Sequence, residues 1–227
     1  MLLIVAFYQV WAQNPQTEMS DLEQWGIRGK VKSQINSTYH TSDVDTLNCK
    51  PIDTTKWFRK TIVYYDTFGN TLETQILKNT GQNIDTLKIK YNTLKNLNES
   101  YFIKGHDTLF TYKKKWIDST SYSIESYNKD HKLFLKTTTN IRKSNQRTEK
   151  NEAFNNSNFE YLSTDYYEFN SDNYIFKKFR IDKSDLKYSE KYREKCYDDK
   201  GNSILTLRSQ EQENTDFFIF REYKYYE

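Results

Sequence analysis

Residues 64–73, Tyr-Tyr-Asp-Thr-Phe-Gly-Asn-Thr-Leu-Glu, contain the features that decide the fold. A strand is expected to end at Tyr65, and a second strand is expected to resume after Asn70. Between them Asp66 begins a turn, while Gly69 and Asn70 supply the positive φ that a tight turn requires. The stretch therefore predicts a β-hairpin.

The same order recurs near the C-terminus, where residues 196–205 read Cys-Tyr-Asp-Asp-Lys-Gly-Asn-Ser-Ile-Leu. The second turn is formed by Tyr197, Asp198, Gly201 and Asn202. Three degraded copies lie between the two, at residues 91–96, 127–132 and 169–174. Because the intervals between copies vary, the sequence predicts a series of hairpins rather than a solenoid of constant period.

Composition and patterning extend this prediction to the whole chain. Only 36% of the 227 residues are hydrophobic, but 16% are aromatic, including 19 tyrosines, and strands favour aromatic side chains. Apolar and charged residues alternate at 87–91, which indicates strands with one buried face. We expect an all-β fold: an antiparallel meander of hairpin repeats that forms a curled sheet or an open barrel or sandwich-like single domain.

The domain is expected to span residues 25–227, with a helical turn before Gly26 and a first strand from Val31. The polar, Asn-rich residues 140–158 indicate an exposed loop or hairpin tip and a candidate lobe boundary. Residues 13–24 are expected to be an N-terminal linker.

The apolar run at residues 1–12 resembles the end of a signal peptide, although the basic segment that usually precedes such a run is missing. A buried N-terminal strand is the alternative. Twelve apolar residues are too few to span a bilayer, so no membrane span is expected in the mature chain. We therefore expect export to the periplasm, the cell surface or the medium. There Cys49 and Cys196 could form a disulfide, or both could be buried thiols.

The Tyr-Asp-x-x-Gly-Asn turns resemble tyrosine-aspartate (YD) repeats, and the layout is similar to short YD-repeat-like exported proteins of Bacteroidota. The stretch Gly29-Lys30-Val31-Lys32 adds to the likeness, which covers residues 25–226. The resemblance implies an antiparallel meander. Long YD arrays enclose toxin domains, but this chain is too short for that role.

No catalytic, cofactor or metal site is predicted. The sequence lacks the common catalytic motifs, and its three histidines, at positions 40, 106 and 131, are scattered. The aspartates beside the Gly-Asn turns lack the ligand spacing of a calcium loop, so they are expected to cap turns. An enzyme stays an alternative, because two carboxylates can be brought together by the fold alone.

Aromatic residues are the candidate binding groups, since exposed rings stack on sugars or anchor protein partners. The candidates are Trp25, Trp57, Trp116, Tyr166 and Tyr167. The alternative is that they form the core. The basic runs 113–115 and 177–180 are expected to be solvated or edge lysines, and no nucleic acid partner is expected, because charge is nearly balanced at +3 and the chain is expected to be exported.

The sequence thus predicts a non-catalytic binding or structural protein. The first hypothesis is interaction with another envelope or secreted protein through an open edge or face of the β-sheet. The alternative is a glycan-binding module, and an enzyme with a deep pocket is the third possibility.

Overall fold

The computed structural model describes residues 20–79, 84–92, 99–104, 107–142, 146–155, 158–171, 174–182 and 185–227. The predicted signal segment lies outside these residues. One short helix, α1 (Asp21–Gln24), precedes the strands, and η1 (Thr41–Asp43) is a single 3-10 turn. The strands of the main sheet are β1 (Val31–His40), β4 (Arg59–Tyr65), β5 (Thr71–Asn79), β6 (Ile84–Asn92), β7 (Glu99–Lys104), β8 (Asp107–Asp118), β9 (Ser121–Asn128), β10 (Leu133–Arg142), β11 (Gln146–Asn155), β12 (Asn158–Phe169), β13 (Ile175–Asp182), β14 (Asp185–Tyr197), β15 (Ser203–Gln210) and β16 (Thr215–Tyr225).

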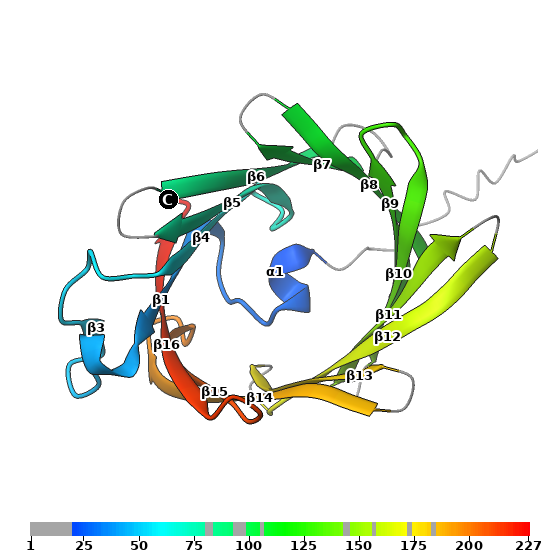
Figure 1. The fold of residues 1–227 in the computed structure, drawn as a ribbon. Helices are drawn as coiled ribbons and strands as arrows, with labels where there is room; N and C mark the ends of the chain where they lie inside the picture. Colours follow the sequence, from blue (N-terminus) through cyan, green and yellow to red (C-terminus); the bar gives the residue numbers. More distant parts are fainter. Residues whose placement is uncertain are drawn as a thin grey trace, which may run out of the picture.

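These strands form one closed antiparallel ring (Figure 1). From β4 to β16 each strand pairs with the next one along the chain. The ring closes at β1, which pairs with β16 on one side and with β4 on the other; Tyr39 lies opposite Phe218, and Ile35 lies opposite Ile62. The prediction of an all-β antiparallel meander is confirmed, and the pairings of β1 close the sheet that the sequence left curled or open.

The hairpin turns share one hydrogen-bonding pattern. The side chain of Asp66 accepts the backbone N–H groups two and four residues later, at 2.9 and 2.8 Å, and Asp198 does the same at 3.0 and 2.7 Å. Asn128, in a degraded copy, accepts the equivalent pair at 3.0 and 2.9 Å. The fourth turn position has positive φ in each case: 87° at Gly69, 58° at His131 and 78° at Gly201. The turn survives loss of Gly because an Asn oxygen replaces the Asp oxygen and His131 adopts the left-handed conformation.

Gly69→Ala is expected to destabilise the protein by about 1–2 kcal/mol, because a Cβ at positive φ is strained. The added Cβ would also approach the Oγ of Ser20 and the Cδ1 of Leu22 to 3.1 and 3.2 Å. Urea denaturation measures the loss of unfolding free energy. Thr67→Ala in the same turn is the control, because Thr67 is exposed. Equal effects of the two substitutions would contradict the argument.

The lumen side of each strand is identified by α1, which lies inside the ring (Figure 1). The Nζ of Lys114 on β8 lies 3.8 Å from the Oδ1 of Asp21 in the helix. Side chains alternate along a strand, so Lys113 and Lys115 point outward. The basic run 113–115 is therefore split between the two faces, and in a closed ring it does not lie on a sheet edge.

Residues 140–158, the predicted candidate lobe boundary, contribute strand residues to the wall of the ring. Most of this segment belongs to the hairpin of β10 and β11, whose pairing runs without a shift from Leu135 to Arg142. Its polar side chains fit a strand because the lumen is itself polar. Arg147 is buried there, and Asn151 hydrogen bonds to the strands on both sides, β10 and β12.

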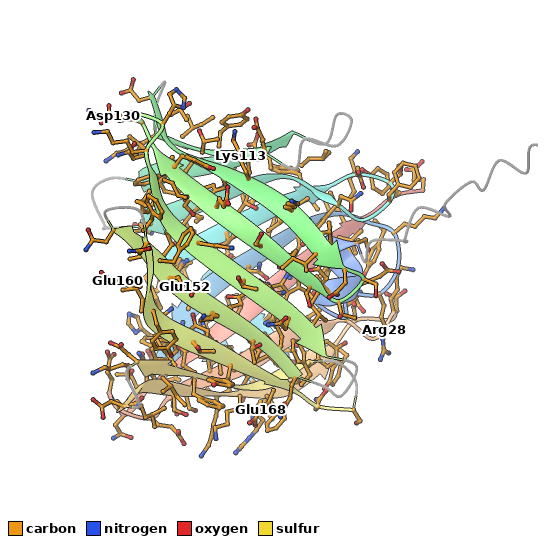
Figure 2. The ribbon with its side chains drawn as sticks, turned by 90° about the vertical axis from the view of Figure 1, so that its right-hand side faces the viewer. Arg28, Lys113, Asp130, Glu152, Glu160 and Glu168 are labelled. Carbon is orange, nitrogen blue, oxygen red and sulfur yellow. A yellow bond between two sulfur atoms is a disulfide. The ribbon has the colours of Figure 1, made fainter. Side chains whose placement is uncertain are left out.

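A row of charges of alternating sign crosses the outer wall. The register places five residues directly opposite one another on successive strands β7 to β11: Glu99, Lys113, Glu125, Lys136 and Glu152. Opposite charges in such cross-strand positions attract each other. Lys113 and Glu152 lie on the wall that faces the viewer in Figure 2. In the same view, Asp130 and Arg28 lie at opposite ends of the ring.

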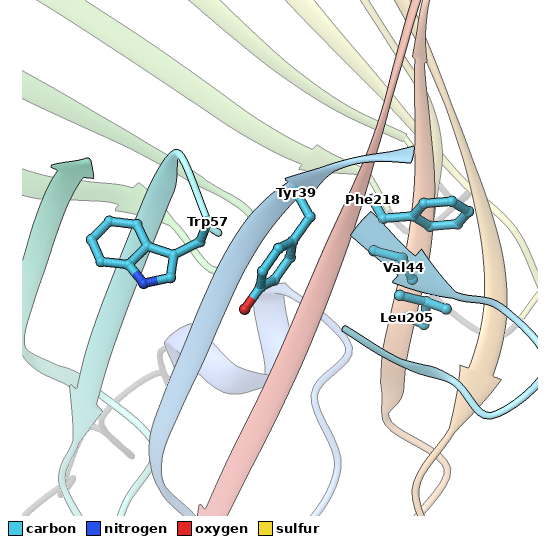
Figure 3. Packing of buried hydrophobic residues seen from close by; sticks show 5 residues of the cluster. All are labelled: Tyr39, Val44, Trp57, Leu205 and Phe218. Carbon is cyan, nitrogen blue, oxygen red and sulfur yellow. The ribbon is translucent and has the colours of Figure 1, made fainter. Parts of the chain in front are cut away.

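A short two-stranded flap, β2 (Val44–Asp45) and β3 (Lys50–Pro51), lies outside the ring (Figure 1). Val44 packs with Leu205 and Phe218 of the outer wall, which explains how Leu205 becomes fully buried on an outer face (Figure 3). The flap is joined to β14 by the disulfide between Cys49 and Cys196, whose Cα atoms are 6.2 Å apart. Of the two states that the sequence left open, the structure contains the disulfide.

Within the described residues, no helix has both the length and the hydropathy to cross a bilayer.

Candidate functional site

The N-terminal segment folds into the lumen at one end of the ring. Ser20 caps α1 in a capping box, in which its hydroxyl accepts the N–H of Glu23 and the Glu23 carboxylate accepts the N–H of Ser20. The helix ends at Trp25, and Gly26 and Gly29 turn the chain into β1 with φ of 66° and 83°. Of the predicted linker over residues 13–24, residues 20–24 are docked in the domain, and residues 13–19 lie outside the described residues.

One side of the helix is fixed to the wall near β4 and β5. The N–H of Leu22 donates to the carbonyl oxygen of Gly69 at 3.1 Å, and the N–H of Thr71 donates to Asp21 Oδ2 at 2.8 Å. Leu22 is buried in a small cluster with Val31 and Tyr65. This end of the segment is held by both backbone and side-chain contacts.

The other side of the segment contacts the opposite wall. The guanidinium of Arg147, on β11, lies 4.4 Å from the ring centroid of Trp25, a cation–π contact. Arg147 also donates a hydrogen bond to the hydroxyl of Tyr122 at 2.9 Å, and Trp25 meets Tyr167 edge to face at 6.2 Å. With contacts on opposite walls, residues 20–30 cross this end of the lumen.

A third attachment lies at the β14–β15 turn. The N–H of Arg28 donates to Asn202 Oδ1 at 2.7 Å, and Asn202 Nδ2 donates to the carbonyl oxygen of Arg28 at 2.9 Å. Asn202 is fully buried. One of the predicted turn residues therefore also anchors the N-terminal segment, a role that its position in a turn did not indicate.

A cavity of about 450 Å³ lies in the lumen beside this segment. Its walls come from β1, β4 and β5 on one side and from β14, β15 and β16 on the other, with Trp25 and Ile27 at the N-terminal segment. The polar lining comprises chiefly Gln34, Asn36, Thr38, Arg59, Thr61, Thr71, Thr74, Glu194, Ser203, Arg208 and Arg221.

Tyrosine rings line the end of the cavity near the N-terminal segment, and their hydroxyls are fixed. Tyr65 donates to Gln34 Oε1 at 3.0 Å, and Tyr223 donates to the carbonyl oxygen of Ser203 at 3.2 Å. Burial raises the pKa of Tyr223 to about 12, so the phenol is neutral at physiological pH. These rings offer apolar faces beside hydrogen-bonding groups.

Two arginines of the cavity lining lie close to glutamate carboxylates that balance their charge. Arg208 forms an ion pair with Glu190, which is buried. The Glu190 carboxylate also accepts a 2.5 Å hydrogen bond from the hydroxyl of Tyr192. Arg221 lies 3.8 Å from Glu194. A third arginine, Arg59, lines the cavity from the first position of β4 and is exposed.

The five predicted binding aromatics do not form one platform. Trp25 lines the cavity, whereas Trp57 is buried in the cluster that contains Tyr39, and Tyr167 is buried against Trp25. Trp116 packs edge to face on Tyr122 at 5.0 Å, on the lumen side. Tyr166 stacks on Phe179 of β13 with centroids 4.8 Å apart. Asp165 and Tyr167, the residues on either side of Tyr166 along β12, face the lumen. Side chains alternate along a strand, so Tyr166 and Phe179 face outward.

Most of the cavity lining was not predicted as a site. The available signal was the alternation of Gln34, Asn36 and Thr38 with Ile35 and Ser37 in a strand. Such alternation identifies two faces of a strand, and an amphipathic strand normally turns its polar face to water. Nothing in the pattern marks that polar face as the wall of an enclosed lumen.

The histidines do not meet in the described residues. His40 contacts the rings of Phe58 and Phe217, His131 lies in a turn, and His106 lies outside the described part. In that part of the chain, no cluster of three or more His, Cys, Asp or Glu residues could hold a metal ion.

No protein-family model matches the chain, and no relative was found among the curated proteins. A crystal structure of a porin-like protein from Bacteroides uniformis is similar with a TM-score of 0.45 and 10% sequence identity. The likeness covers 86% of this chain and 96% of that protein. The resemblance to YD repeats stays a prediction.

Proposed function

We propose that this chain is a non-catalytic binding protein that holds a small saccharide in its lumen. The observation that supports this proposal best is the cavity of about 450 Å³ beside a segment that crosses one end of the ring. Its volume lies within the range of about 300–1,000 Å³ typical of small-ligand sites. A segment across the lumen favours a one-mouthed binding cup over an open channel.

The chemistry of the lining favours a saccharide. Aromatic rings can pack on the apolar faces of a sugar, and amide, hydroxyl and guanidinium groups can bond its hydroxyls. Trp25 and Tyr223 provide rings in the cavity, and Asn36 and Thr61 provide polar groups on the adjoining wall. The sequence suggested a glycan site on exposed aromatic residues; the proposed site is instead the cavity in the lumen.

Export is supported by two features of the described residues. The Cys49–Cys196 disulfide is typical of an oxidising compartment. The charged row on the outer wall suits contact with water, because a Lys facing the middle of a bilayer costs about 2–4 kcal/mol. We therefore propose that the ring lies in the aqueous phase of the periplasm or outside the cell.

Binding of a protein partner is a second candidate function. The sequence allowed contact through an open edge or a face of the sheet, and the closed ring leaves only the face. Every strand of the ring is paired on both sides, so an open edge is not offered by the ring. A partner from the envelope or the medium would instead meet the outer face. The stacked pair Tyr166 and Phe179 is an aromatic feature suited to such a contact.

Saccharide binding is testable with the full chain. A panel of neutral and acidic disaccharides titrated against the protein is expected to change its tryptophan fluorescence, because Trp25 lines the cavity. Thr61→Phe should fill the cavity and weaken binding at least tenfold. Thr148→Phe is the matched control, since Thr148 lies between two lumen-facing residues of β11 and points outward.

Circular dichroism should show that both variants keep the fold. Absence of binding to every disaccharide would overturn the saccharide proposal, and so would equal affinities of the two variants. Chromatography of the bound sugar after prolonged incubation tests whether the protein is non-catalytic, as proposed. Cleavage or modification of the sugar would show that the protein is an enzyme.

A further inference from the structure

We propose that the saccharide carries a carboxylate and that Arg59 binds this group. This inference rests on the proposed function, since it names the ligand class of the same cavity. It is carried by the position of Arg59 and by the charge balance of the cavity lining.

Arg59 is placed at the end of the cavity away from the N-terminal segment. It begins β4, whereas Tyr65 ends the same strand beside the cluster that contains Leu22. A strand rises about 3.3 Å per residue, so roughly 20 Å separate the two ends. Arg59 thus stands at the opposite end of the cavity from the N-terminal segment, and its side chain is exposed; we take this end as the mouth of the cup.

The neighbours of Arg59 on the lumen side do not neutralise it. Directly opposite residues of an antiparallel pair share a face, and the cross-strand neighbours of Arg59 are Thr38 on β1 and Lys78 on β5. One is uncharged and the other is cationic. Among the described residues, no ion pair includes Arg59, whose side chain is exposed.

The other charged groups of the lining are already matched. Arg208 is paired with Glu190, and Arg221 lies near Glu194. Glu194 also accepts hydrogen bonds from the hydroxyls of Ser203 and Thr206. Arg59 therefore leaves the cavity with an uncompensated positive charge, which favours an anionic ligand over a neutral one.

A carboxylate fits this charge by geometry as well as by sign. The guanidinium presents parallel N–H donors that match the two oxygens of a carboxylate, and such bidentate pairs are stronger than neutral hydrogen bonds. The acid group would bind at the mouth while the sugar ring extends toward the tyrosines. A uronic acid unit has this combination of groups.

The test compares a glucuronic acid-containing disaccharide with its glucose-containing neutral counterpart, by isothermal titration calorimetry on the full chain. The wild-type protein is expected to bind the acidic disaccharide at least tenfold more tightly at low salt. Arg59→Gln should remove this preference, because the affinity for the acidic disaccharide falls far more than the affinity for the neutral one. Arg193→Gln is the matched control, because Arg193 is exposed and lies between cavity-lining residues, on the outward side of β14.

The outcomes separate the two proposals. Equal affinities for the acidic and neutral disaccharides in the wild-type protein would overturn the role of Arg59 but leave saccharide binding intact. A preference that persists in Arg59→Gln, or that is lost equally in Arg193→Gln, would also overturn it. Binding of neither disaccharide, with other saccharides also failing, would overturn both.

Discussion

Loss of the Cys49–Cys196 disulfide is expected to lower the free energy of unfolding by about 4 kcal/mol. The bond joins residues 147 positions apart, and a cross-link that closes a long loop removes much conformational entropy from the unfolded chain. It also holds the flap on the outer wall, where Val44 covers Leu205. The measurement is urea denaturation of the wild-type protein and of a Cys49→Ser/Cys196→Ser double variant.

A reducing agent provides the control for this prediction. It should lower the stability of the wild-type protein toward that of the double variant and leave the double variant unchanged. A difference below about 1 kcal/mol between the oxidised wild-type protein and the double variant would show that the bond contributes little. Mass spectrometry of the unreduced protein should show two fewer hydrogens than the reduced form.

Asp165→Asn is expected to cost about 3 kcal/mol at neutral pH, because Asp165 is the centre of a buried network in the lumen. The residue is 3% exposed, and its carboxylate accepts two hydrogen bonds from Arg180, at 2.8 and 2.7 Å. The hydroxyl of Tyr188 donates a third at 2.9 Å. Asn cannot carry the charge that pairs with Arg180.

The same residue predicts a pH dependence. Burial acts to raise the pKa of Asp165, but the hydrogen bonds from Arg180 and Tyr188 outweigh it and hold the pKa below its ordinary value. A carboxyl whose pKa is lower in the folded than in the unfolded state stabilises the fold fully above the unfolded value, about 3.9. That stabilisation is lost as pH falls through the folded pKa.

The stability difference between the wild-type protein and Asp165→Asn should therefore be largest near pH 7 and shrink below about pH 4. Denaturation curves at a series of pH values measure it. Asp216→Asn is the control, because Asp216 is an exposed aspartate on β16. A difference between wild-type and Asp165→Asn that is constant from pH 7 to pH 3 would contradict the assignment of the effect to the Asp165 charge.

The binding site was less predictable than the fold because its residues are ordinary strand residues. Gln34 and Arg59 line the same cavity only because β1 pairs with β4. Tyr223 joins them because β1 also pairs with β16, almost 200 positions later. These cavity-lining residues belong to no local sequence motif, whereas the turns are marked by their Asp, Gly and Asn residues.

The sequence by itself determined the hairpins, because their turns depend on local chemistry: an Asp or Asn oxygen that accepts two N–H groups, and a residue with positive φ. It also predicted the helical turn before Gly26 and the start of β1 at Val31. Period-two alternation was enough to predict strands with two unlike faces.

Only the tertiary structure decided that the meander closes and which face of each strand lines the lumen. Closure depends on β1 meeting both β4 and β16, and pairing between the two ends of a chain has no local signal. Once the ring is closed, polar and charged side chains from different strands meet inside it: Arg180 donates to Asp165, and Arg147 donates to Tyr122. The described polar residues at 140–142 and 146–155 are therefore strand residues in the wall, because the lumen that they border is polar rather than an apolar core.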